Sequence, residues 1–146
     1  MFDFSMMDVA LREADIALSE GEVPIGAAIF KGNELISSGH NRLISLNDPT
    51  AHAEVVAIRD ACKRLKTHML SDCVIYVTLE PCALCTKAIM LARMRKICFG
   101  AYNFKTGAVF HGENMLYLHK NILEVIGGIR EIECSQSLKK FFLARR

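Results

Sequence analysis

This sequence has no strong excess of charge of either sign. Its 146 residues carry 18 Lys and Arg against 16 Asp and Glu, which gives a formal net charge of +2. That balance excludes a basic tail of the kind that coats nucleic acid through charge alone.

Long apolar runs and an export signal are also missing. The longest apolar stretches fall well short of a membrane span. The stretch from Met1 to Leu18 carries acidic residues throughout and has no basic region followed by an apolar run, so we predict no signal peptide. We therefore expect a cytoplasmic protein without a membrane partner. Its six cysteines should be reduced there, and clustered Cys and His in such a compartment more often bind metal than form disulfides.

No low-complexity linker and no internal repeat divides the chain. With 51% hydrophobic and 23% charged residues, it has the profile of a soluble protein long enough to bury a core without disulfides. We expect a single domain over residues 1–146.

Predicted strands and helices alternate along this domain. Apolar residues recur at helical spacing near residues 6–20, and Cys134, Leu138, Phe141 and Phe142 place an apolar face on a C-terminal helix. Two more helices are expected, one at 48–65 with Asp48 as cap and Pro49 in its first turn, the other at 81–93 with Pro81 at its start. Expected strands, the first two forming an antiparallel hairpin, cover 23–30, 35–41, 73–79, 96–102 and 122–126. This alternation predicts an α/β sandwich around a mostly buried sheet.

Two short segments concentrate the reactive side chains, and each begins a predicted helix. "PCALC" holds Cys82 and Cys85, which are three apart and share one face of a first helical turn, where the helix dipole favours thiolates. "HAE" holds His52, a third ligand of a type that zinc prefers. Zinc with three protein ligands keeps its fourth position for water, as in catalytic sites. A structural zinc would need a fourth ligand, for which His40 is the nearest candidate.

Glu54 lies two residues after His52 and suggests what that water does. A carboxylate beside such a metal can take a proton from water and pass it to a leaving group. As a first-turn acid, Glu54 could instead stabilise the helix N-terminus. The neighbouring His52 and the P-C-x-x-C segment favour proton transfer. A thiol-redox role for Cys82 and Cys85 would leave His52 and Glu54 without a purpose.

Together, "HAE" and "TLEPCALC" match the H-x-E…P-C-x-x-C signature of the zinc deaminases. The segments "EVPIGA", "GHNRLISLNDPTAHAE", "FGAYNFKTGA" and "KKFFLARR" resemble the bacterial tRNA-specific adenosine deaminase family over nearly the whole chain. The resemblance implies a cytidine deaminase-like α/β fold, a three-layer α-β-α sandwich around a mixed sheet of roughly five strands. It also implies hydrolysis of adenosine to inosine at the wobble position of a tRNA anticodon, with release of ammonia.

The same resemblance assigns roles to individual residues. It implies one zinc ion per chain on His52, Cys82 and Cys85, with Glu54 as the proton shuttle. Its implied partners are a tRNA anticodon stem-loop and a second copy of the chain, which would border each active site in a homodimer. The implied substrate contacts are Asn41, the backbone N–H of Ala53, Asn103, Lys105 of "KTGA", Phe141, Phe142 and Arg145.

More ordinary roles remain open for several of these residues. Asn41 could be a turn residue that ends a strand, and the two C-terminal phenylalanines could belong to the core. Two basic clusters, Lys63–Arg64–Lys66 and Arg93–Arg95–Lys96, could face phosphates or be solvated surface.

Asn103 is a departure from the family pattern, which has aspartate at this position and a basic residue where this chain has Tyr102. In the family, the aspartate lies near the nucleotide before the target, where it can accept a hydrogen bond from a ribose 2′-hydroxyl. An amide removes the charge and adds donors. We therefore expect weaker discrimination against deoxyribose, unless Asn103 is only a turn residue whose side chain caps its loop.

Two other functions fit the same pattern. A free nucleobase or nucleoside deaminase of the guanine or cytosine type would share the fold and the metal chemistry, and would need no folded anticodon stem. A zinc-stabilised binding module without catalysis would have a closed, four-ligand metal site and would be insensitive to substitution of Glu54.

Overall fold

Five strands form one mixed sheet in the computed structural model, which describes residues 3–110 and 124–145. The spatial order is β2 (Glu34–His40), β1 (Gly26–Lys31), β3 (Val74–Leu79), β4 (Lys96–Ala101) and β5 (Glu124–Ile126). Strand β1 is antiparallel to both of its neighbours, β2 and β3, whereas β3, β4 and β5 run parallel. The predicted mixed, five-stranded α/β architecture is confirmed.

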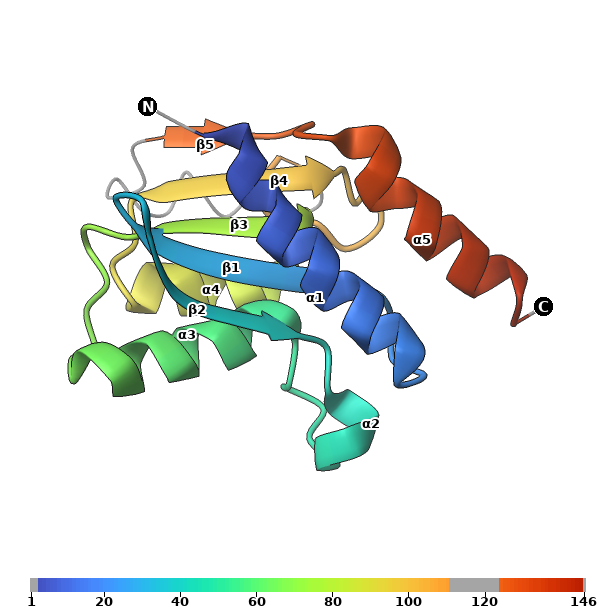
Figure 1. Ribbon diagram of the computed structural model, residues 1–146, viewed down its shortest axis with the longest axis horizontal. Coiled ribbons are helices and arrows are strands. Elements are labelled where there is room, and N and C mark those ends of the chain that lie inside the picture. Colours follow the sequence, from blue (N-terminus) through green and yellow to red (C-terminus); the bar gives the residue numbers. More distant parts are fainter. Residues whose placement is uncertain (1–2, 111–123, 146) are drawn as a thin grey trace.

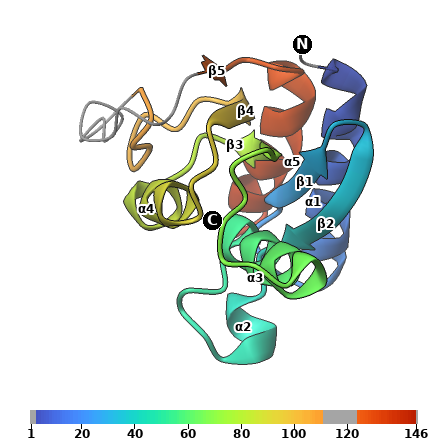
Figure 2. The ribbon, with the colours of Figure 1, turned by 90° about the vertical axis from the view of Figure 1, so that its left-hand side faces the viewer.

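Helices cover both faces of the sheet, which makes three layers (Figures 1 and 2). On one face lie α1 (Met7–Ser19), which follows a short 3-10 turn at Phe4–Met6, and α5 (Glu131–Leu143). On the other face, α3 (Ala53–Leu65) and α4 (Ala83–Leu91) pack side by side. A one-turn helix, α2 (Leu43–Leu46), connects β2 to α3. Within the described ranges, no helix is both long and apolar enough to span a membrane.

Strand side chains alternate between two separate cores. Ile29, Ile75 and Val77 pack with α3 and α4, whereas Phe30 and Tyr76 pack with α1 and α5. Because both faces are covered, the central strands are continuously apolar instead of alternating apolar and polar residues.

Glycines allow two helices to approach the sheet closely. A side chain at Gly26 would collide with the backbone of α1 at Ala10, and one at Gly39 would lie 3.0 Å from the carbonyl oxygen of Ala53 in α3. The second approach matters for function, because it holds the N-terminal end of α3 against β2.

The predicted start of the helix at 48–65 was wrong. Asp48 does not cap α3; its Oδ1 accepts hydrogen bonds from the N–H and hydroxyl of Thr50, at 2.9 and 2.7 Å. The carbonyl of Ala51 then accepts from the N–H of Arg42 at 3.0 Å, which ties the segment to the end of β2. The chain is therefore non-helical up to its N-cap, His52.

Two smaller expectations also needed correction. Pro81 precedes the N-cap of α4, which is Cys82. Phe142, expected on the apolar face of α5, is 56% exposed, whereas Cys134, Leu138 and Phe141 are buried. The last predicted strand, at 122–126, is confirmed over Glu124–Ile126, and its first two residues lie outside the described residues.

Candidate active site

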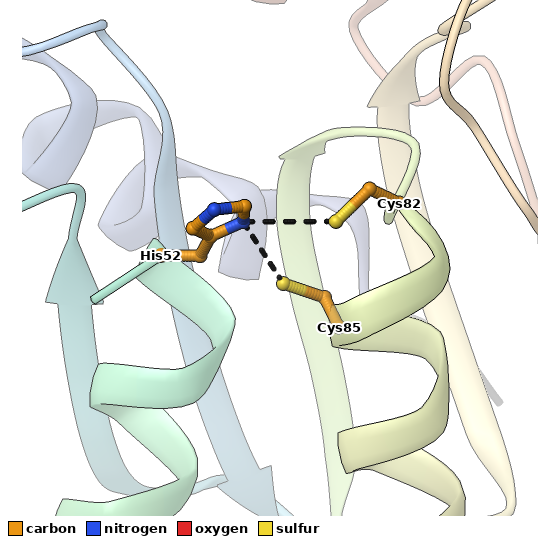
Figure 3. A group of neighbouring side chains, drawn as sticks. All are labelled: His52, Cys82 and Cys85. Atoms are coloured by element: carbon orange, nitrogen blue, oxygen red, sulfur yellow. Dashed lines mark hydrogen bonds between the residues drawn. The ribbon is translucent and has the colours of Figure 1, made fainter. Parts of the chain in front are cut away.

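The three predicted metal ligands meet between the N-terminal ends of α3 and α4 (Figure 3). Nδ1 of His52 lies 3.6 Å from Sγ of Cys82 and 3.4 Å from Sγ of Cys85. All three ligand atoms lie within 4.8 Å of one another. The site is at the carboxyl end of β3, where a short turn leads into α4 (Figure 1).

Local backbone geometry explains why the ligands converge. His52 and Cys82 are both N-cap residues with extended backbone, and neither side chain makes a capping hydrogen bond. Both side chains are therefore directed across the gap between the helices and not back onto their own backbone. Cys85 reaches the same point from the first turn of α4.

Charges at this cluster are distributed unequally between the two thiols. A hydrogen bond from Cys85 lowers the pKa of Cys82 to about 4, whereas the same contact and burial raise the pKa of Cys85 above its usual range. The hydrogen bond to Cys82 also raises the pKa of His52. A metal ion would replace the protons that these groups share.

This donor set fits zinc. Two cysteine sulfurs and one imidazole nitrogen are borderline to soft ligands, and three of them leave a fourth position in a tetrahedral site. His40 is not part of the cluster: its Nδ1 bonds to Glu13 at 3.0 Å and its Nε2 to Glu20 at 2.6 Å. The fourth ligand that we considered for a closed structural site is thus engaged elsewhere.

Glu54 lies beside the ligands and is only 4% exposed. Burial raises the pKa of its carboxyl to about 7. The carboxyl also lines a pocket of about 130 Å³ together with His52 and Cys82. A buried carboxyl at this place is suited to proton exchange with a molecule in the pocket.

Asn41 and Ala53 form another part of the same pocket. The side-chain oxygen of Asn41 accepts the backbone N–H of Ala53 at 2.9 Å, which fixes the amide at the start of α3. Asn41 is 7% exposed and lines the pocket, and its amide nitrogen has no hydrogen-bond partner among the described residues. The N–H of Ala53, expected to contact the base, is used for this internal bond.

Residues 103–110, which we name the pocket loop, close the opposite side of the pocket through Asn103 and Thr106. The Asn103 side chain donates to the Thr106 hydroxyl at 2.8 Å and accepts from its N–H at 3.1 Å. Asn103 is thus both a loop-capping residue and a wall of the pocket. Lys105 is exposed at the tip of the same turn.

The C-terminal element divides into buried and exposed parts. Phe141 is 6% exposed and belongs to the core, and the Arg145 guanidinium lies 3.5 Å from the centre of its ring. Phe142 lines a second, more apolar pocket with Tyr102 and Leu79. Because Leu79 lines both pockets, Phe142 is placed next to the candidate site.

Neither basic cluster borders the site. Lys63, Arg64 and Lys66 lie at the C-terminal end of α3, a helix about 20 Å long, and the site is at its other end. Arg64 in addition bonds to the carbonyls of Leu35 and Ile36 at 2.8 and 2.9 Å. The second cluster follows the C-terminal end of α4, likewise away from the site (Figure 1).

Sequence reasoning missed two buried carboxylates, one of which lies in the pocket wall. Glu22 is 2% exposed and accepts the N–H groups of Ile44 and Ser45 at 3.2 and 2.9 Å, which fixes the start of α2. Glu80 is 1% exposed and lines the pocket. The signal for Glu80 was its place directly before Pro81 and Cys82.

Comparison with known proteins agrees with this geometry. The family described as "Cytidine and deoxycytidylate deaminase zinc-binding region" matches residues 2–101. The tRNA-specific adenosine deaminase of Aquifex aeolicus is 51% identical over 75% of this chain and 73% of its own length. A structure solved in studies of A-to-I editing by tRNA:A34 deaminases has a TM-score of 0.87 and 39% identity over 93% of this chain and all of that one. A guanine deaminase from Nitrosomonas europaea has a TM-score of 0.82 at 25% identity, over 96% of this chain and 84% of that one.

The fold and the His-Cys-Cys site thus define a deaminase with a zinc-binding region. Within this class, the chain belongs to the family of tRNA-specific adenosine deaminases.

Proposed function

We propose that this protein hydrolyses adenosine to inosine at the wobble position of a tRNA anticodon and releases ammonia. The observation that carries the proposal is the convergence of His52, Cys82 and Cys85 with the buried carboxyl of Glu54 on one pocket. The similarity to tRNA-specific adenosine deaminases supports this choice of substrate.

Each pocket residue has a distinct task in this reaction. One zinc ion per chain, when bound by the three ligands, supplies a Lewis acid that lowers the pKa of a water molecule. Glu54 would take one proton from the attacking water and deliver it to the ring nitrogen next to the reacting carbon. It would then take the second proton, from the new hydroxyl group, and pass it to the amine, which leaves as ammonia while the carbonyl forms. Asn41 holds the adenine edge through its amide nitrogen, since its oxygen is bound to Ala53.

The surroundings of the pocket supply the RNA contacts. The anticodon nucleotides on either side of the flipped adenosine would lie along the pocket loop, with Asn103 and Lys105, and along the end of α5, with Phe142 and Arg145. Exposed aromatic and basic side chains are what single-stranded RNA recognition uses. Phe141 supports Arg145 from within the core.

We expect the enzyme to act in the cytoplasm as a homodimer, with residues 1–146 as a single deaminase domain. All six cysteines are free, which suits a reducing compartment. Leu84 and Leu91 on α4 are 43% and 66% exposed and seven residues apart, so they share one outward face of that helix. Such a face is suited to a second copy of the chain.

A free guanine deaminase is the second candidate, favoured by the structural similarity to such enzymes. The experiment that separates the two incubates purified, zinc-loaded protein with an anticodon stem-loop that carries adenosine at the wobble position, and in parallel with guanine, cytosine and adenosine. Mass spectrometry of the digested RNA should detect inosine at that position. Turnover of a free base without inosine in the stem-loop would contradict the proposal.

A further inference from the structure

Glu80 lies in the pocket wall but has no part in the chemistry proposed above. Its Oε1 accepts the backbone N–H of Asn103 at 3.2 Å. Its Oε2 accepts those of Val109 and Phe110 at 3.3 and 2.9 Å. A carboxylate is tolerated in the interior where several donors saturate it, and hydrogen bonds to a charged acceptor are the stronger kind. Glu80 therefore holds both ends of the pocket loop.

Further contacts join the pocket loop to the residues that follow Glu80. The N–H of Ala108 donates to the carbonyl of Pro81 at 2.9 Å, and Gly107 pairs with Cys82 in an isolated antiparallel bridge. The loop thus lies against three consecutive residues, the last of which is a metal ligand. A shift of the loop relative to these residues would change the distance between the pocket wall and the metal.

Gly107 shows how closely the loop and the carboxylate fit. A Cβ atom at this position would lie 2.4 Å from the carbonyl oxygen of Asn103 and 2.6 Å from Oε2 of Glu80, closer than real side-chain contacts allow. Any side chain there would displace either the loop or the carboxylate. The wall formed by Asn103 and Thr106 consequently depends on the fit between Gly107 and Glu80.

We propose that Glu80 is a positioning residue. It fixes the position of the pocket loop relative to the metal ligands, and the loop in turn determines where the RNA strand binds. The inference rests on the proposed function. Both oxygens of the Glu80 carboxylate bond to the backbone of the loop. Its substitution should therefore affect how the substrate is held far more than the chemical step.

Glu80→Gln is the first test, because glutamine has nearly the same shape but only one acceptor oxygen. Its amide nitrogen would present hydrogen atoms to one of the two sets of backbone N–H groups, and that end of the loop would detach. The KM for the stem-loop should rise roughly tenfold or more, while kcat stays within about threefold, since the loop binds ground state and transition state alike. Zinc content should be unchanged.

Amide hydrogen exchange supplies a readout that activity alone does not. The N–H groups of Asn103, Val109 and Phe110 should exchange faster in Glu80→Gln than in the wild type. Glu22→Gln is a matched control, because Glu22 is also buried and accepts two backbone N–H groups, in α2. It should lose comparable thermal stability and leave the three pocket-loop amides unaffected.

Gly107→Ala tests the same fit from the loop side, and remains informative if Glu80→Gln does not fold. It should also raise KM and speed exchange of the pocket-loop amides. Both substitutions disrupt the same contact between Gly107 and Glu80. The loss of binding free energy calculated from the KM of the double variant should therefore be smaller than the sum of the losses in the two single variants. Fully additive effects would show that the two residues act separately and would overturn the proposal.

Two further outcomes would contradict the positioning role. One is faster exchange with an unchanged KM, because the position of the loop would then not determine binding. The other is a large fall in kcat with loss of zinc, because Glu80 would then support the ligands and not the loop. If the wild-type protein produced no inosine in the stem-loop, the proposed function would be wrong; the exchange measurement would still show whether Glu80 holds the loop.

Discussion

The two sides of the pocket are built differently. On one side, His52 and Glu54 begin α3, and Cys82 and Cys85 begin α4, so the reactive groups lie on helices that are packed against the sheet. On the other side, the pocket loop has no regular secondary structure and depends on hydrogen bonds to Glu80 and on its own side chains. In the proposed reaction, chemistry is thus placed on rigid elements and recognition on a loop.

This difference separates the expected effects of substitutions. Changes at the helix starts should stop the reaction on every substrate. Changes at the loop or at the end of α5 should alter the affinity or the choice of substrate while the chemistry continues.

Removal of a ligand should have the largest effect. Cys82→Ala and Cys85→Ala should each reduce zinc affinity by more than the roughly 10–100-fold that loss of an outer-shell partner costs, and should abolish turnover. Thermal stability should fall as well, because the metal joins α3 to α4. Elemental analysis and thermal melts measure both effects, with Cys62→Ala as a control outside the cluster. Full zinc occupancy in either ligand variant would rule the assignment out.

Glu54→Gln should keep the metal and the fold but reduce turnover by at least about 10²–10⁴-fold, because the amide cannot relay a proton. Single-turnover kinetics on the zinc-loaded variant measure this effect. Glu133→Gln, which removes a carboxylate in an exposed ion pair with Arg130, is the control and should remain active. Near-normal turnover of metal-loaded Glu54→Gln would favour a binding module over an enzyme.

The two neighbouring phenylalanines of α5 should behave differently. Phe142→Ala should weaken stem-loop binding by about 1–3 kcal/mol, the usual contribution of one stacked base, with little change in stability. Phe141→Ala should instead cost about 3–5 kcal/mol of unfolding free energy, because its ring is buried. Fluorescence anisotropy and denaturant titrations distinguish the two. An unchanged dissociation constant for Phe142→Ala would remove this residue from the RNA interface.

Asn103→Asp should have the smallest effect and the most specific one. A carboxylate can still accept the N–H and the hydroxyl of Thr106, so the turn should persist while the charge changes. We expect the ratio of activity on ribo- to deoxyribo-oligonucleotides of the same loop to rise a few-fold, as one additional hydrogen bond of about 1 kcal/mol would give. Thr106→Val is the control, because it removes the hydroxyl that bonds to Asn103 in the turn and leaves the charge of the loop unchanged. An unchanged or lower ratio in Asn103→Asp would mean that Asn103 only caps its loop.

The metal site could be predicted from the sequence because its ligands occupy two short segments with a specific spacing. The sheet could be predicted because both of its faces are buried and its strands are continuously apolar. Helix starts were harder, since Asp48 and Pro49 have the composition of an N-terminus but form a turn with Thr50. A side chain that can cap either a helix or a turn does not reveal which one it caps.

The buried glutamates that hold the loops in place could not be predicted from the sequence, for a different reason. Glu80 bonds to N–H groups 23 to 30 residues away, and Glu22 to N–H groups 22 and 23 residues away. Every residue except proline has a backbone N–H, so no pattern of side chains marks these partners. The direction of the pKa shift of Glu54 likewise could not be predicted from the sequence, because it depends on how deeply the carboxyl is buried.

The central claim is that this pocket hydrolyses adenosine within an anticodon loop by means of the His52–Cys82–Cys85 metal site. The most direct test supplies the stem-loop in water labelled with heavy oxygen, using zinc-loaded protein, chelator-treated protein, and chelated protein to which zinc is restored. Mass spectrometry of the digested RNA should find inosine with the heavy isotope at its new carbonyl in the first and third samples only. Labelled inosine formed equally well after complete removal of the metal, or no inosine in any sample, would contradict the claim.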